Sequence, residues 1–224
     1  MSGTDAWRIP AGLLALSAIP LAAGALRLVQ LAGGPAAVPA DARFAPFPAP
    51  VVVHILGAAV YLVVGVLQFI PRFRRRHRDW HRRAGRVVAL AGLAVAGSAL
   101  WLTLGYPFKP GTGVVLYVLR LFFGAAMAGA LIAGVAAIRR RDVRAHRARM
   151  IRAYAIGLAA GTQALTEGIG GALFGTGELA GDLAKAAGWL INLVVAEWII
   201  RRPGRRGRRR PRIPTVAGER ELRR

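Results

Sequence analysis

The chain has 224 residues, of which 55% are hydrophobic, with a mean hydropathy of +0.43 and a formal net charge of +22. Of its 32 basic residues, 26 lie in the segments 72–86, 139–152 and 201–224. Between these segments run apolar stretches of about twenty residues, long enough to cross a bilayer core of ~30 Å. This distribution excludes an ordinary soluble enzyme, a disordered basic protein and a secreted disulfide-bonded scaffold. Because the sequence has no cysteine, it also excludes thiol catalysis, iron–sulfur clusters and cysteine-ligated zinc.

Six membrane helices are predicted, one for each long apolar stretch. All are continuous in Leu, Val, Ala, Ile and Gly rather than alternating, which excludes β-barrel strands. Pro20 predicts a kink in the first helix, and glycines within 168–171 loosen the end of the fifth. The expected fold is an all-α integral membrane six-helix bundle, formed by one domain (1–200) and followed by a basic tail (201–224) that we expect to be disordered. The predicted helices span about 9–32, 50–71, 87–105, 114–138, 151–174 and 183–200.

The basic residues orient this bundle. Short loops rich in arginine stay on the cytoplasmic side of a membrane, and the segments after the second, fourth and sixth helices hold 26 of the 32 basic residues. The loops after the first, third and fifth helices hold only Arg43 and Lys109. Both termini are therefore predicted to be cytoplasmic, in a bacterial inner membrane. The basic segments should attract anionic lipid head groups at ~1 kcal/mol per residue near the surface. Nucleic acid is not an expected partner, because no aromatic or fold-like feature accompanies the tail.

Four short motifs follow one another along the chain. In this order they resemble an uncharacterised bacterial membrane-protein family, the domain of unknown function 2306, over roughly residues 50–165. Ala148-Arg149 departs from the family, in which an aromatic residue is expected before Met150. The resemblance implies a multi-helix inner-membrane protein with no assigned activity. The motifs are His54-x2-Gly57, Gln68-Phe69, His81-Arg82-x2-Gly85-Arg86 and His146-x3-Met150-x-Arg152-x-Tyr154.

The second predicted helix has a stripe of polar and glycine residues. Its members are spaced three or four residues apart and therefore share one side of a helix, which must face protein rather than lipid. His54, at the outer end, either hydrogen-bonds inside the bundle or binds a ligand or a proton. The stripe consists of His54, Gly57, Tyr61, Gly65 and Gln68.

A pair of histidines is expected on the cytoplasmic side. His81 and His146 both follow basic runs, at the starts of the third and fifth predicted helices. Two histidines at one membrane face could bind the iron of haem b axially, or a metal ion, with Arg86 or Arg152 pairing with the haem propionates. The alternative is that these residues cap helices, bind lipid phosphates and fix the loops.

A second polar cluster is predicted in the outer half of the membrane. Ionisable residues inside a membrane cost ~2.5–3.5 kcal/mol each on insertion scales, so they usually pair or line a polar cavity. We expect Arg120 to be the partner of Glu167, because a short loop joins their helices. Such a cluster is either a structural ion pair or a substrate or proton site. Its predicted members are Arg27, His54, Arg120, Gln163 and Glu167.

Three classes of function remain. The favoured one is a non-enzymatic membrane protein that binds lipid or scaffolds a complex with a membrane-protein partner or a second copy. The second is a b-type haem redox protein using His81 and His146, although transmembrane cytochromes usually place paired histidines within helices. The third is a small transporter or permease using the outer cluster, although no broken-helix symmetry is visible. No Ser–His–acid set or metalloprotease motif is present, so a hydrolase is not expected.

Overall fold

The described part of the chain is helical almost throughout. The computed structural model describes residues 5–202, and in this range it has eight α-helices, one short 3-10 helix and no strand, which confirms the all-α fold class. From residue 203 onward the predicted tail lies outside the described residues. The elements are α1 (Asp5–Leu31), η1 (Ala42–Phe44), α2 (Ala49–Gln68), α3 (Pro71–Arg76), α4 (Arg78–Leu104), α5 (Val114–Arg139), α6 (Val143–Gly157), α7 (Ala159–Phe174) and α8 (Glu178–Arg201).

Five of the described helices are long and apolar enough to cross a membrane, namely α1 from Arg8 onward, α2, α4, α5 and α8. The prediction of one continuous helix over 151–174 is wrong, because the chain divides there into α6 and α7 at Leu158. The predicted end of the second helix is also too late. Ile70 is held in an extended conformation (φ −83°, ψ 105°) by the proline that follows it, so α2 ends at Gln68.

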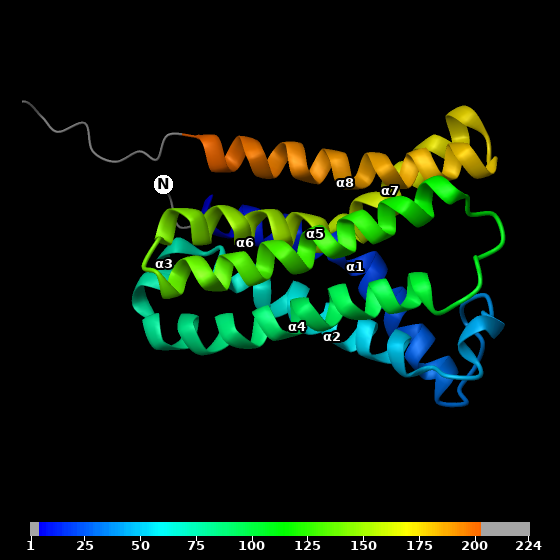
Figure 1. Cartoon of the computed structure of the whole chain (residues 1–224), viewed down its shortest axis with the longest axis horizontal. Coiled ribbons are helices and arrows are strands. Elements are labelled where there is room, and N and C mark those ends of the chain that lie inside the picture. Colours follow the sequence, from blue (N-terminus) through cyan, green and yellow to red (C-terminus); the bar gives the residue numbers. More distant parts are fainter. Residues whose placement is uncertain (1–4, 203–224) are drawn as a thin grey trace, which may run out of the picture.

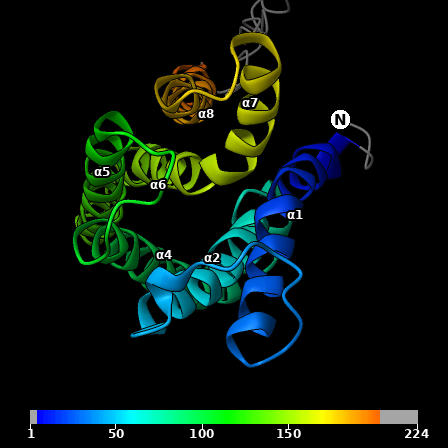
Figure 2. The ribbon, with the colours of Figure 1, turned by 90° about the vertical axis from the view of Figure 1, so that its right-hand side faces the viewer.

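The long helices run side by side along the longest axis of the molecule (Figure 1). The start of α1 and the end of α8 lie at the same end, together with α3 and the turn between α5 and α6. Seen along that axis, α1, α2, α4, α5 and α6 follow one another around a ring, which α7 closes by packing against α1, and α8 lies outside the ring beside α6 and α7 (Figure 2).

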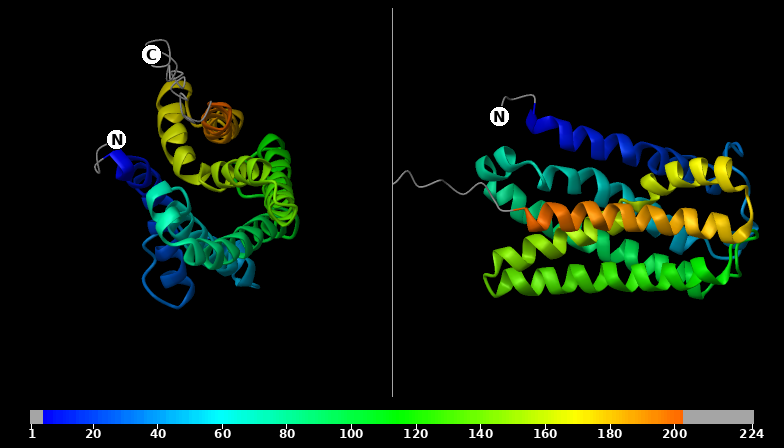
Figure 3. Two further views of the ribbon diagram at one scale, coloured as in Figure 1. Left: turned by 90° about the vertical axis from the view of Figure 1, so that its left-hand side faces the viewer. Right: turned by 90° about the horizontal axis from the view of Figure 1, so that it is seen from above.

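The break between α6 and α7 is stabilised by α8. The two helices bend away from one another at the junction (Figure 3), and a carbonyl oxygen freed inside a bilayer needs a partner from the protein. Asn192 supplies it: its side-chain amide donates to the carbonyl oxygen of Ala155 at 3.1 Å and accepts from the hydroxyl of Thr162 at 2.8 Å. Asn192 and Thr162 are both buried. Asn192 and Thr162 therefore stabilise the break between α6 and α7.

The glycine and polar stripe on α2 faces protein, as predicted. A side chain at Gly57 would press against Val95 of α4, and one at Gly65 would press against the ring of Tyr154 from α6. Tyr61 is fully buried between them, and the hydroxyl of Tyr154 donates to the carbonyl oxygen of Leu62 at 3.0 Å. The centre of the bundle is therefore the place where α4 and α6 pack closely against this stripe.

Candidate functional site

A cavity of about 780 Å³ lies inside the ring of helices. Its lining comes from α1, α2, α4, α5, α8 and the region around the α6–α7 break, and most of it is apolar, including Leu62, Met127 and Ile156. This volume is within the range of roughly 300–1,000 Å³ that is typical of small-molecule sites. The charged and hydrogen-bonding side chains that line it are Arg43, His54, Thr103, Arg120, Gln163, Glu167 and Lys185.

Four residues of the predicted outer cluster line this cavity, namely His54, Arg120, Gln163 and Glu167. Arg27 does not line it. Its guanidinium donates to the side chain of Gln30 at 2.6 Å and to the carbonyl oxygen of Pro39 at 2.7 Å, and so fixes the segment that follows α1. Four of the five predicted residues therefore border one cavity, and Arg27 lies outside it.

Glu167 pairs with Lys185 rather than with Arg120. The ammonium nitrogen of Lys185 lies 2.9 Å from a carboxylate oxygen of Glu167. Gln163, one turn before Glu167, donates to the carbonyl oxygen of Lys185 at 3.0 Å. These contacts join α7 to α8. The predicted pairing is wrong because α7 turns away from α5 at Leu158 and packs against α8.

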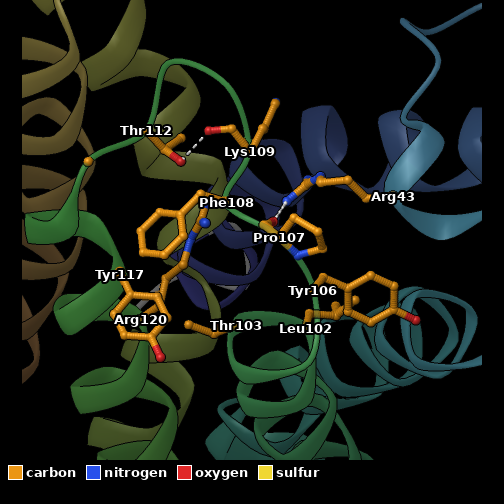
Figure 4. Close-up of a pocket in the computed structure, with 11 residues that line it drawn as sticks. Arg43, Leu102, Thr103, Tyr106, Pro107, Phe108, Lys109, Thr112, Tyr117 and Arg120 are labelled. Carbon is orange, nitrogen blue, oxygen red and sulfur yellow. Dashed lines mark hydrogen bonds between the residues drawn. The ribbon is translucent and has the colours of Figure 1, made fainter.

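Arg120 is left without a direct partner. No residue in 5–202 forms a hydrogen bond or an ion pair with its guanidinium, although Asp182 and Glu167 lie within electrostatic range. The side chain is half-buried and borders both the large cavity and a small pocket at its outer end (Figure 4). Arg43 and Lys109 line the same small pocket. Three cationic side chains therefore gather where the cavity reaches the loop between α4 and α5.

Asp182 is a buried carboxylate that the sequence did not single out, and it joins α8 to the start of α5. Its side chain is 1% exposed and accepts from the backbone N–H of Gly113, at 3.0 Å, and of Leu116, at 3.0 Å. These are N–H groups at the start of α5 that have no partner within the helix. A side chain at Gly113 would collide with Asp182 and Glu178, so glycine is needed there. The sequence offered no signal for this contact, because its two sides are far apart in the chain.

His54 forms a hydrogen bond inside the bundle, which was one of the two alternatives for this residue. Its Nδ1 atom lies 3.1 Å from the hydroxyl oxygen of Ser98 on α4, and that hydroxyl also contacts the carbonyl oxygen of Ala94 at 2.6 Å. His54 lines the cavity as well. It is therefore a hydrogen-bonded residue of the cavity wall.

His81 and His146 lie within electrostatic range of one another. His146 has its Nδ1 atom 2.9 Å from the carbonyl oxygen of Gly134, which requires Nδ1 to donate and leaves Nε2 free. Nδ1 of His81 is buried without a hydrogen-bond partner, as are both polar atoms of the Gln68 side chain. A side chain at Gly85 would touch the amide oxygen of Gln68, which places that amide beside α4. Unsatisfied polar atoms thus gather where α2 ends and α4 begins.

The two arginines predicted beside this pair have other surroundings. The guanidinium of Arg152 makes two contacts with the carboxylate of Glu197 on α8, at 2.5 and 3.1 Å. Arg86 is exposed on α4. Among the described residues no group of three or more His, Cys, Asp or Glu side chains is arranged to hold a metal ion.

The fold and its cavity define an integral membrane protein with several apolar helices. The family model described as "Predicted membrane protein (DUF2306)" matches residues 51–200, most of the chain. The chain therefore belongs to this family, as its motifs predict, and the match continues to the end of α8. No curated protein and no solved structure matches the chain.

Proposed function

We propose that this protein is a non-enzymatic, multi-pass protein of the bacterial inner membrane that binds an amphipathic small molecule of the lipid class in its central cavity. The observation that carries the proposal is the composition of the cavity wall. It is apolar over most of its surface and polar where Arg120, Gln163 and Lys185 meet. A molecule with a hydrocarbon part and a polar head matches this division.

We also propose six membrane crossings with both termini in the cytoplasm. The segment Val143–Phe174 is about 48 Å long when α6 and α7 are taken together, enough to cross a core of ~30 Å despite its bend. Support for the orientation comes from the basic segments around α3 and between α5 and α6, which lie at one end of the molecule (Figure 1).

Binding can be tested by fluorescence quenching in lipid nanodiscs. Trp189 lines the cavity and stacks on Phe123 with ring centroids 4.6 Å apart, whereas Trp101 is exposed on the outside of α4. A variant that keeps only Trp189 should show saturable quenching by ω-bromo-undecanol or ω-bromo-undecanoate. A variant that keeps only Trp101 should show quenching that rises in proportion to the probe dissolved in the bilayer.

A cavity-filling substitution sharpens the test. Ala160 lines the cavity and its side chain is exposed, so Ala160→Phe should weaken the saturable quenching of Trp189. Ala172 lies on the same helix, is exposed and does not line the cavity, so Ala172→Phe is the matched control. Equal quenching behaviour of Trp189 and Trp101 would overturn the proposal.

A second candidate is the b-type haem protein, and one observation favours it. A metal-binding histidine usually donates its other ring N–H to a carbonyl or carboxylate, as His146 does to Gly134. His81, with a buried and unpartnered Nδ1, is the second ligand in this hypothesis.

A third candidate, a permease, is favoured by the break between α6 and α7 beside the cavity. Discontinuous helices at mid-membrane frequently border transport sites.

A further inference from the structure

Among the described residues that line the large cavity, each lysine, arginine and glutamate has a charged partner except Arg120. Arg43 makes two contacts with the carboxylate of Asp41, at 2.8 and 2.6 Å, and a third with the carbonyl oxygen of Pro107 at 3.0 Å. Arg43 holds the pKa of Asp41 below its usual range, so this pair stays ionised. Lys185 is neutralised by Glu167.

The exception is Arg120, and its position makes the missing partner significant. It lies six residues into α5, about 9 Å from the start of that helix along the axis. An arginine at such a depth is costly unless it is paired, and it stays charged because the guanidinium does not deprotonate in proteins. Glu167 is within electrostatic range but is bound to Lys185. An anion bound at Arg120 would offset this cost.

Resting on the proposed function, we propose that the ligand of the cavity is a single-chain amphiphile with an oxyanion head group, a carboxylate or a phosphate, which Arg120 binds. The planar guanidinium donates two parallel hydrogen bonds to such a group. The hydrocarbon chain lies along the apolar wall, which extends from His54 to Leu62, about 12 Å on α2.

The size and charge of the site agree with a ligand that has one hydrocarbon chain and one anionic head group. The cavity of about 780 Å³ fits a small amphiphile, and its apolar wall includes Ile55, Ala58 and Leu62 of α2 as well as the stacked pair of Phe123 and Trp189. At the outer end, Lys109 adds positive potential around the head group. An uncharged head group would leave Arg120 unpaired.

The test compares three probes that share one chain and differ in the head group: ω-bromo-undecanoate, ω-bromo-undecyl phosphate and ω-bromo-undecanol. Each is titrated into nanodiscs that contain the variant whose only tryptophan is Trp189, at a pH at which the carboxylic acid is ionised. We expect at least one anionic probe to bind about tenfold to a hundredfold more tightly than the alcohol, because hydrogen bonds to charged groups are the strong ones. The ratio between the two anionic probes distinguishes carboxylate from phosphate.

Substitutions at Arg120 assign the selectivity to this residue. Arg120→Gln should reduce the affinity of the preferred anion to that of the alcohol and leave the alcohol unchanged. Arg120→Lys keeps the positive charge but loses the planar guanidinium with its two parallel donors. It should therefore retain part of the preference for the anionic probe. Arg86→Gln, an exposed arginine on α4, is the control that should change nothing.

Each outcome has a distinct meaning. Saturable quenching with the same affinity for all three probes would overturn the anionic head group and leave the cavity as a ligand site. Absence of saturable quenching for every probe would overturn the proposed function itself. If Arg120→Gln weakens the acid and the alcohol equally, the arginine supports the fold and does not bind the head group, and the inference fails.

Discussion

Replacing Asp182 by alanine should destabilise the protein strongly. The carboxylate is buried on α8 and accepts hydrogen bonds from Gly113 and Leu116, both of which are buried. Alanine leaves two N–H groups without water or protein partners, at ~1–3 kcal/mol each. It also removes a negative charge from the positive end of α5, worth ~0.3–2 kcal/mol. Together these terms predict a loss of about 2–8 kcal/mol in the free energy of unfolding.

Asp142 provides the matched control. It caps α6 with a single hydrogen bond to the N–H of Ala145 at 2.9 Å, and that bond is exposed. Asp142→Ala should therefore cost about 1 kcal/mol, the usual value for an exposed N-cap. Equilibrium unfolding in mixed SDS and detergent micelles measures both variants. If Asp182→Ala loses no more stability than Asp142→Ala, the buried carboxylate does not hold α5 to α8 and the reasoning is refuted.

Three further predictions concern the paired charges, the histidines His81 and His146, and the orientation in the membrane. Glu167→Gln and Lys185→Met should each lower the unfolding midpoint by leaving one charge unpaired, and the double variant should recover much of the loss; additive losses would contradict the pairing. If the protein binds haem, it should have an intense visible absorption band that disappears in His81→Ala and in His146→Ala and persists in His77→Ala, whereas colourless purified protein would end that hypothesis. A reporter that is active only in the cytoplasm should be active in the loop between α5 and α6 and silent between α7 and α8; activity in both places would remove a crossing.

The sequence predicts the membrane class and most of the helices because apolar length and charge are local properties. The stripe on α2 is equally local, since residues three and four apart share a face whatever the helix packs against. The outer cluster can be predicted in part, because depth in the membrane follows from distance along a helix. His54, Arg120, Gln163 and Glu167 do meet at one cavity.

The break at Leu158 cannot be predicted from the residues that surround it. Residues 151–174 are mostly apolar and compatible with one long helix. The side chain that stabilises the break comes from α8. Asn192 contacts Ala155 of α6 on one side of the break and Thr162 of α7 on the other. The close packing of α7 against α1 also favours the break. A side chain at Gly161 would collide with the backbone of Leu16 on α1. Non-local contacts of this kind leave no periodic pattern in the sequence.

The break explains why the predicted ion pair fails and why the cavity exists. A straight helix over 151–174 would continue alongside α5 and bring Glu167 toward Arg120. Because α7 bends away at Leu158, Glu167 meets Lys185 on α8 and Gln163 reaches the backbone of the same residue. The space between α5 and α7 is then part of the cavity, with Arg120 on its wall and no carboxylate bonded to it. The bend that Asn192 stabilises therefore creates both the volume for a ligand and the unpaired positive charge that selects its head group.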